Sequence, residues 1–213
     1  MGIIGPTGAG KSTIAALLMR LYDIDKGSIL IDGKDIRSME TKDLRSHFGV
    51  VFQNDAVFKN TLEGNIKLNR KIDDEAMILA AKSAQAYDYI MDAGGFNHNI
   101  EARGTNLSGG QKQRLLISRA LADSPDILIL DDSSSALDYR TDMELRKAIH
   151  ENYNDSTTII IAQRVSSVRN CDKILVIDEG KTVGYGTHDE LIKDNELYME
   201  INALQIGEVE KYA

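Results

Sequence analysis

The sequence predicts an α/β fold with a mostly parallel sheet flanked by helices, together with an inserted α-helical lobe. Three observations lead to this prediction. Strand and helix patterns alternate along most of the chain, as they do in successive βαβ units. The strand candidates are almost continuously aliphatic, which is typical of parallel strands buried on both faces. The stretch from 61 to 93 interrupts the alternation, because it carries helical signals and no strand signal.

Each element has its own local signal. Aliphatic runs bounded by glycine, proline or polar residues predict strands at 1–4, 28–31, 48–52, 127–130, 158–162, 174–177 and 182–185. Apolar residues with helical spacing predict helices that begin near 11, 73 and 108, and another over 140–153. Ser124-Pro125 ends the third of these, because the residue before a proline disfavours the helical conformation. Thr187 and Glu190 form a capping box that opens a last helix, and we expect the tail from about Ile206 to fray.

Composition and charge narrow the function classes. The length of 213 residues and the hydrophobic share of 42% suit one globular domain that is expected to be soluble. No apolar run approaches the roughly 20 residues of a membrane helix, and no signal peptide is visible. The single cysteine, Cys171, excludes an internal disulfide and suits a reducing compartment. A net charge of −8 argues against a nucleic-acid partner, which usually requires a basic face.

A phosphate-binding loop follows the first strand. The sequence from Gly5 to Ser12 fits the pattern GxxxxGK[ST], and it stands between a strand and a helix as that motif requires. Glycines let successive backbone N–H groups point at phosphate oxygens, and the start of the helix adds its positive end. Lys11 would reach the β- and γ-phosphates, and the hydroxyl of Ser12 would ligate Mg²⁺. The expected nucleotide-binding residues here are Gly5, Pro6, Thr7, Gly8, Ala9, Gly10, Lys11, Ser12 and Thr13.

A second carboxylate site supports a nucleoside-triphosphatase. Asp131 ends the aliphatic strand that begins at Ile127, and it would hold Mg²⁺ through water, as in a Walker B strand. Between the P-loop and this strand, Ser108 supplies a hydroxyl, and Gly109 and Gly110 offer N–H groups at the start of a helix. Taken alone, this second anion site could equally be a plain helix cap.

The stretch Leu107-Ser-Gly-Gly-Gln111 decides the family that the chain resembles. It is similar to the signature sequence of ATP-binding-cassette (ABC) ATPases, and the other motifs occur in that family's order over essentially the whole chain. The resemblance implies that Gln53 is the Q-loop glutamine that contacts Mg²⁺ or water, that Ser135–Asp138 is the D-loop, and that Gln163 occupies the switch position. It also implies that Ser108, Gly109, Gly110 and Gln111 contact the nucleotide and that Ser12, Gln53 and Asp131 serve the metal.

The resemblance further implies a dimeric ATPase at a membrane. In the family, two cassettes pack head to tail, and each ATP lies between the P-loop of one and the signature of the other. Arg103-Gly104 and the stretch 186–191 resemble exporter-type half-transporters, so a transmembrane domain and the cytoplasmic face of the membrane are expected. ATP and Mg²⁺ are the implied cofactors. The implied division is a RecA-like core over 1–60 and 112–205, an α-helical subdomain over 61–111, and a tail over 206–213.

Two substitutions depart from the family pattern at the hydrolytic centre. Asp132 stands where the family usually has the glutamate that polarises the attacking water, and the shorter side chain withdraws the carboxylate by about 1 Å, a displacement that can cost ~10²-fold in rate. Gln163 stands where the family has histidine; an amide donates a hydrogen bond but carries no charge. Together they indicate a half-site that binds ATP yet hydrolyses it slowly, in a heterodimer whose partner supplies glutamate and histidine. A homodimer in which Asp132 works as a slower base is the alternative.

A third departure lies at the front of the chain. The sequence starts four residues before Gly5, whereas the family's domain begins several strands earlier with an aromatic residue that stacks on adenine. We therefore expect a piece of a longer half-transporter or a reading frame begun at an internal Met. Ala102 is a smaller departure, at a position where exporters often have glutamate. Two other functions stay open: an ABC ATPase of DNA repair or translation without transport, and an ATP-binding regulatory module without turnover.

Overall fold

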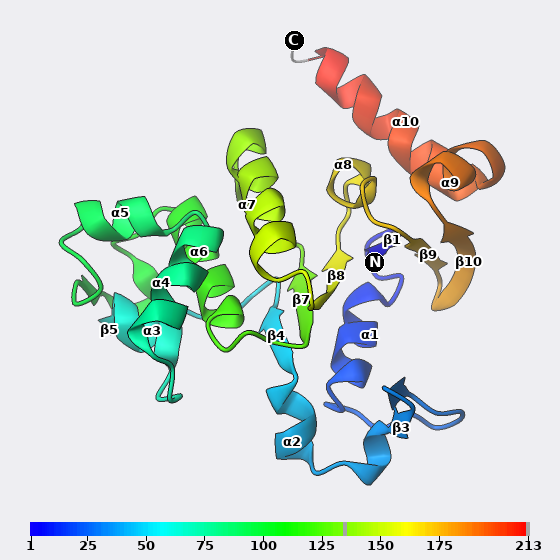
Figure 1. The fold of residues 1–213 in the computed structure, drawn as a ribbon. Coiled ribbons are helices and arrows are strands. Elements are labelled where there is room, and N and C mark those ends of the chain that lie inside the picture. The colour runs from blue at the N-terminus through cyan, green and yellow to red at the C-terminus, as the bar shows by residue number, and fades with distance from the viewer. Residues whose placement is uncertain (134–135, 212–213) are drawn as a thin grey trace. The chain divides into compact units, whose positions relative to one another are not determined.

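The computed structural model describes residues 1–133 and 136–211, and Figure 1 shows the order of its elements along the chain. The chain divides into two compact units. Unit 1 consists of Met1–Ser46, Ile129–Asp132 and Thr158–Ala213, and unit 2 consists of His47–Leu128 and Ser133–Thr157. The predicted division into core, helical subdomain and tail places its boundaries elsewhere and stays a prediction.

The central sheet has six strands in the order β10-β9-β1-β8-β7-β4. Strand β1 (Gly2–Ile4) pairs in parallel with both β8 (Thr157–Ile161) and β9 (Ile174–Asp178). Strand β10 (Lys181–Gly186) is antiparallel to β9. Strand β7 (Ile127–Asp131) passes through both units, and β4 (Phe48–Val51) lies in unit 2. The mostly parallel sheet flanked by helices confirms the predicted fold class.

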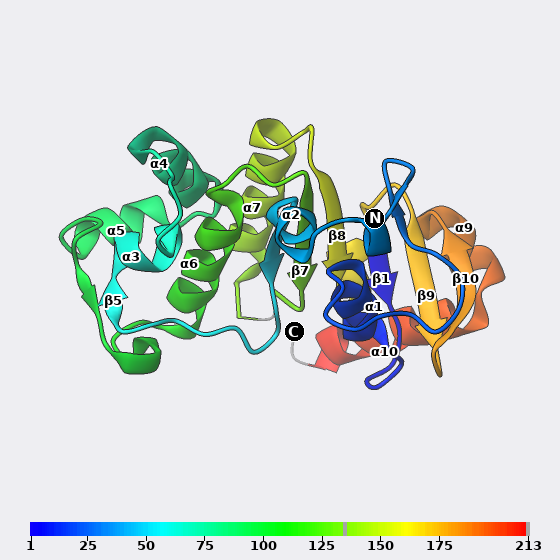
Figure 2. The same ribbon diagram turned by 90° about the horizontal axis from the view of Figure 1, so that it is seen from below.

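The sheet of unit 1 is covered by helices on both faces. Helix α1 (Lys11–Leu18) lies on one face, and α8 (Val165–Val168), α9 (His188–Asp194) and α10 (Glu196–Lys211) lie on the other (Figures 1 and 2). A core cluster joins this second layer to the strands; its buried members are Ile4, Ala162, Val165, Val168, Ile174, Val176, Leu191 and Tyr198. Burying such aliphatic side chains stabilises the unit by about 1.5–3 kcal/mol each.

The remaining elements of unit 1 are short. A hairpin joins β2 (Leu30–Ile31) to β3 (Lys34–Asp35) and leads through a 3₁₀ turn at Ile36–Ser38 to α2 (Thr41–Ser46). The predicted capping box at the start of α9 is confirmed, because Thr187 and Glu190 exchange hydrogen bonds between side chain and backbone. Helix α10 is assigned as far as Lys211, and the expected fraying from about Ile206 stays a prediction.

Unit 2 is mainly helical. It contains α3 (Leu62–Lys67), α4 (Asp74–Ser83), α5 (Tyr87–Asp92), α6 (Gly109–Leu121) and α7 (Tyr139–Asn152), with a 3₁₀ turn at Ala102–Gly104. Strands β5 (Asn60–Thr61) and β6 (Asn99–Ile100) pair antiparallel, so the expectation of no strand from 61 onward is wrong at Thr61. Two-residue strands show no alternation, and the pairing joins segments far apart in sequence.

Among the helices that the structure describes, none combines the length and the apolar character that a membrane span needs.

Candidate nucleotide-binding site

The loop Gly5–Gly10 joins β1 to α1 and has a backbone that few residues other than glycine adopt. Gly8 has φ +83° and Gly10, the N-cap of α1, has φ +99°. The loop is closed by a hydrogen bond of 3.2 Å from the N–H of Ala9 to the carbonyl of Pro6. The tip, from Pro6 to Gly8, is exposed. A loop of this shape presents its peptide N–H groups to an anion.

Lys11 lies beneath the loop and holds its shape. Its Nζ donates hydrogen bonds of 2.8 Å to the carbonyls of Gly5 and Pro6, and the residue is only 8% exposed. Burial lowers the pKa of Lys11 below its usual value, while the charges of Asp131 and Asp132 oppose that shift. Unit 1 therefore brings the P-loop lysine and the two carboxylates at the end of β7 within electrostatic reach of one another.

The turn between β9 and β10 supports the loop from the side. The N–H of Gly180 donates to the carbonyl of Ala9 at 3.1 Å. Gly5 is packed directly against β9, because a Cβ at this position would lie 2.0 Å from the carbonyl oxygen of Ile177. Real Cβ atoms never approach a backbone oxygen so closely, so the glycine at position 5 is required by packing as well as by the anion site.

Asp131 and Asp132 differ in their surroundings. Asp131 ends β7 and is 4% exposed, whereas Asp132 is half-buried and has φ +48°, a left-handed conformation that aspartate tolerates better than most residues. The N–H of Asp132 donates to the carbonyl of Ile161 at 2.8 Å. Burial and the charge of Asp131 raise the pKa of Asp132 above its usual value, and the charges of Arg164 and Lys11 oppose this. A carboxylate whose pKa is raised accepts a proton more readily than an ordinary aspartate does.

Gln163 follows β8 in unit 1 and its side chain is exposed. Its backbone carbonyl accepts a hydrogen bond of 2.8 Å from the side-chain amide of Gln205 in α10. The neighbouring Arg164 is the residue whose charge acts on Asp132. The predicted switch residue Gln163 and the predicted base Asp132 thus lie in the same unit as the P-loop.

The signature residues begin helix α6 in unit 2. Ser108 is its N-cap, and a capping box is formed: the N–H of Gln111 donates to Ser108 Oγ at 3.2 Å, and the N–H of Ser108 donates to Gln111 Oε1 at 2.9 Å. The box uses Oγ as an acceptor and leaves the hydroxyl proton as a donor. It also leaves the N–H groups of Gly109 and Gly110 at the positive end of the helix.

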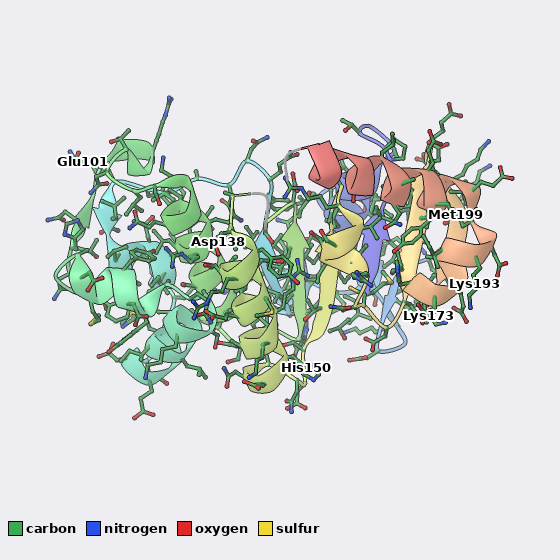
Figure 3. The ribbon with its side chains drawn as sticks, turned by 90° about the horizontal axis from the view of Figure 1, so that it is seen from above. Glu101, Asp138, His150, Lys173, Lys193 and Met199 are labelled. Carbon is green, nitrogen blue, oxygen red and sulfur yellow. The ribbon has the colours of Figure 1, made fainter. Side chains whose placement is uncertain are left out.

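The D-loop lies against these glycines within unit 2. A Cβ on Gly110 would lie 3.3 Å from the carbonyl oxygen of Ala136, a tight contact that a side chain could make only with a small shift of one of the two segments. Asp138 accepts a hydrogen bond of 2.9 Å from the N–H of Thr141 and begins α7, with His150 near the far end of the helix (Figure 3). Ser135, the first residue of the predicted D-loop, lies outside the described residues.

Gln53 lies just beyond β4 in unit 2 and is exposed. The loop that follows it is held from inside the unit by Asn65, which is fully buried in α3. Asn65 Oδ1 accepts from the N–H of Phe58 at 2.8 Å, and Asn65 Nδ2 donates to the carbonyl of Phe58 at 2.9 Å. This pair of bonds holds the backbone of Phe58, five residues after Gln53.

A buried arginine links this loop to the signature helix. Arg119, near the end of α6, donates to the carbonyl of Asn65 at 2.8 Å and to the carbonyl of Ala56 at 2.9 Å. It also lies 3.5 Å from a carboxylate oxygen of Asp55 and stacks over the ring of Phe58. Helix α6, which starts after Ser108, therefore contacts the segment 55–58 near its other end.

The structure distributes the predicted site over both units. The P-loop residues, Asp131, Asp132 and Gln163 lie in unit 1, and Gln53 and residues 108–111 lie in unit 2. Within the described part of the chain, no group of three or more His, Cys, Asp or Glu side chains is placed to hold a metal. The predicted Mg²⁺ ligands Ser12, Gln53 and Asp131 are of mixed type and stay a prediction.

Sequence reasoning missed Arg119, Asn65 and Gln205. Arg119 carried a visible signal, because it is a charge within the otherwise apolar run that ends α6. A charge in such a run is rarely buried unless it is paired. Asn65 and Gln205 carried no local signal.

Comparisons with known proteins decide the family. The family described as "ABC transporter" matches residues 1–135 of the chain. The chain belongs to the ABC transporter family.

Individual relatives agree with this assignment. The chain is 43% identical over 211 residues to "Uncharacterized ABC transporter ATP-binding protein YknU" of Bacillus subtilis, a match that covers 98% of the chain and 36% of the relative. It is 42% identical to a "Putative multidrug export ATP-binding/permease protein" of Staphylococcus aureus, covering 96% of the chain and 36% of that protein. A solved bacterial Atm1-family ABC exporter with ATP bound has a TM-score of 0.91 and 40% identity, covering 96% of the chain and 36% of the exporter. The chain thus spans about a third of the length of these relatives.

Proposed function

We propose that this chain is the ATP-binding domain of an ABC exporter, and that its own P-loop binds MgATP but hydrolyses it slowly. The observation that carries the proposal is the cluster of Lys11, Asp131 and Asp132 under an exposed P-loop, with aspartate rather than glutamate as the second carboxylate. The export proteins among the relatives support coupling to a transmembrane domain at the cytoplasmic face of the membrane.

The residues of unit 1 fit a nucleoside triphosphate with Mg²⁺. The P-loop is exposed, and a Cβ added to Gly8 would meet nothing within 4 Å, so its backbone face is open to an anion. The loop N–H groups and Lys11 would hold the phosphates, while Ser12, Gln53 and Asp131 would serve the metal. Bound Mg²⁺ neutralises charge on the phosphates. Ser108, Gly109 and Gly110 of this chain would supply donors to a second nucleotide, bound at the P-loop of the other cassette, and the side chain of Gln111 would keep Ser108 capped.

Slow hydrolysis follows from geometry and charge. Asp132 would accept a proton from the attacking water; its pKa is raised, so it is basic enough, but its carboxylate is one methylene shorter than that of glutamate. Gln163 would donate a hydrogen bond from its amide without bringing a charge. Both replacements weaken the same step, and neither removes a phosphate contact.

The partner that fits these replacements is a second ABC subunit with glutamate and histidine at the two positions. In this arrangement the intact signature at Ser108–Gln111 would complete the partner's active site, and this chain's P-loop would form the slower one. The proposed parts are the RecA-like core at 1–60 and 112–205 and the helical subdomain at 61–111. Full turnover by a homodimer of the full-length protein would contradict the heterodimer.

Replacing Lys11 by alanine should weaken MgATP binding by about 10²-fold, because charge-assisted hydrogen bonds to phosphate are lost together with the two bonds that shape the loop. Equilibrium titration of the full-length protein with a fluorescent ATP analogue measures the change. Lys181→Ala, at an exposed lysine of β10, is the matched control and should bind as the wild type does. Unchanged affinity in Lys11→Ala would reject the P-loop as the binding site.

Introducing Asp132→Glu and Gln163→His together should raise ATP turnover by about 10²-fold, since the carboxylate regains its reach of about 1 Å. Steady-state phosphate release at saturating MgATP measures this. Each single variant should give a smaller gain, because both residues act on one step. The affinity for MgATP should stay within a few-fold of the wild type.

A further inference from the structure

Gln205 in α10 bridges the backbone on both sides of Arg164. Its Nε2 donates to the carbonyl of Gln163 at 2.8 Å, and its Oε1 accepts from the N–H of Val165 at 2.8 Å. The donor faces a carbonyl and the acceptor faces an N–H, so only one orientation of the amide makes both bonds. A single side chain, 40 residues away in sequence, thereby fixes two consecutive peptide groups of the segment Gln163–Val165, the switch segment.

The switch segment has no side-chain cap of its own at the start of helix α8, so the hydrogen bonds from Gln205 take that place. Arg164 is the N-cap of α8, has extended backbone angles (φ −102°, ψ 131°) and makes no capping hydrogen bond with its side chain. The first N–H groups of a helix have no partner inside the helix. Gln205 supplies the missing acceptor to Val165, the first residue of α8.

Helix α10 is well anchored where it leaves α9. Tyr198 is fully buried, its N–H donates to Asn195 Oδ1 at 2.8 Å, and its hydroxyl lies 2.9 Å from His188 Nδ1. Leu197 and Ile201 pack against the same core cluster as Val165 and Val168. Met199, in the same stretch of the helix, is labelled in Figure 3. The first turns of α10 thus form a fixed support from which Gln205 reaches the switch segment.

We propose that Gln205 is a positioning residue for ATP hydrolysis, which holds the Gln163–Val165 segment so that the switch side chain keeps its place relative to Asp132. The proposal rests on the function proposed above for Gln163 and Asp132. It adds that α10, which touches none of the phosphate-binding residues by a described hydrogen bond, sets the rate of the chemical step.

The first test separates kcat from KM. In the full-length protein with Asp132→Glu and Gln163→His, where turnover is high, Gln205→Ala should lower kcat about tenfold and leave KM for ATP within twofold, because two backbone hydrogen bonds are lost and no phosphate contact is. Leu204→Ala, at the exposed neighbour on the same helix, should change neither value. An unchanged kcat in Gln205→Ala would overturn the proposal.

The second test asks whether Gln205 acts through residue 163. In a protein with Asp132→Glu and Gln163→Ala, adding Gln205→Ala should cause no further loss of kcat, since the side chain to be positioned is gone. A second tenfold loss would show that Gln205 acts by another route and would overturn the positioning role.

The third test does not depend on hydrolysis. Amide hydrogen exchange at Val165 should be about tenfold faster in Gln205→Ala than in the wild type and unchanged in Leu204→Ala. Unaltered exchange at Val165 would show that Gln205 does not hold the switch segment. If the wild type fails to bind MgATP while exchange at Val165 responds as expected, the proposed function is wrong but Gln205 still holds the switch segment. The two failures are therefore distinguishable.

Discussion

Replacing Arg119 by methionine should lower the free energy of unfolding by about 3 kcal/mol. The substitution removes a buried charge and leaves the groups that it binds without a partner. The carbonyls of Asn65 and Ala56 would lose their donor, and Asp55 would lose its counter-charge. Arg119 is 7% exposed, so water cannot replace these bonds without opening the unit. Urea unfolding followed by circular dichroism measures the loss.

The matched control is an exposed arginine with the same kind of partner. Arg140 forms a 2.9 Å ion pair with Glu144, but its side chain is 83% exposed, so Arg140→Met should leave the free energy of unfolding almost unchanged. Arg119→Lys should recover only part of the loss, since one ammonium cannot reproduce the forked contacts to the two segments that hold Asp55–Ala56 and Asn65. Equal effects at positions 119 and 140 would mean that the buried network contributes nothing.

Replacing Gly5 by alanine should destabilise unit 1 by about 3 kcal/mol or more and abolish nucleotide binding. The new Cβ would lie 2.0 Å from the carbonyl oxygen of Ile177, so β1 and β9 must move apart or the P-loop must change course. The strands of a buried sheet are closely packed, so they can shift apart only slightly. The shift in unfolding midpoint and the affinity for MgATP measure the two effects.

Two other glycines separate this clash from simple backbone strain. Gly8 and Gly27 have φ of +83° and +82°, and a Cβ on either would meet nothing within 4 Å. Gly8→Ala and Gly27→Ala should therefore each cost only about 1–2 kcal/mol, the penalty of a left-handed L-residue. Gly27→Ala should also leave ATP binding unaffected. If Gly5→Ala costs no more than Gly27→Ala, the close packing of Gly5 on β9 is wrong.

The parts of the fold that the sequence predicts are those that local pattern determines. Aliphatic runs marked β1, β4, β7, β8, β9 and β10 to within a residue or two at each end, and the capping pair Thr187–Glu190 marked the start of α9. The P-loop is one continuous stretch, so its residue types and spacing are visible together. Hydrophobic periodicity and capping act over a few residues, which is why these predictions succeed.

The parts that escaped prediction depend on contacts between distant segments. Arg119 binds the carbonyl of Asn65 across 54 positions, and Gln205 binds the carbonyl of Gln163 across 42. Neither asparagine nor glutamine carries a periodic signal, and an amide that binds backbone can do so anywhere in a fold. The sequence therefore marks Arg119 as unusual, but the partners of Arg119 and the contacts of Gln205 are found only from the structure.

The slow P-loop site is tested most directly by single-turnover hydrolysis of radiolabelled MgATP, because this measurement isolates the chemical step from binding and product release. The full-length wild type is compared with the variant that carries Asp132→Glu and Gln163→His, each mixed in excess with its nucleotide. We expect the variant to hydrolyse bound ATP about 10²-fold faster at an affinity within a few-fold of the wild type. Equal single-turnover rates, with both proteins fully loaded, would contradict the assignment of Asp132 and Gln163 as the cause of slow hydrolysis.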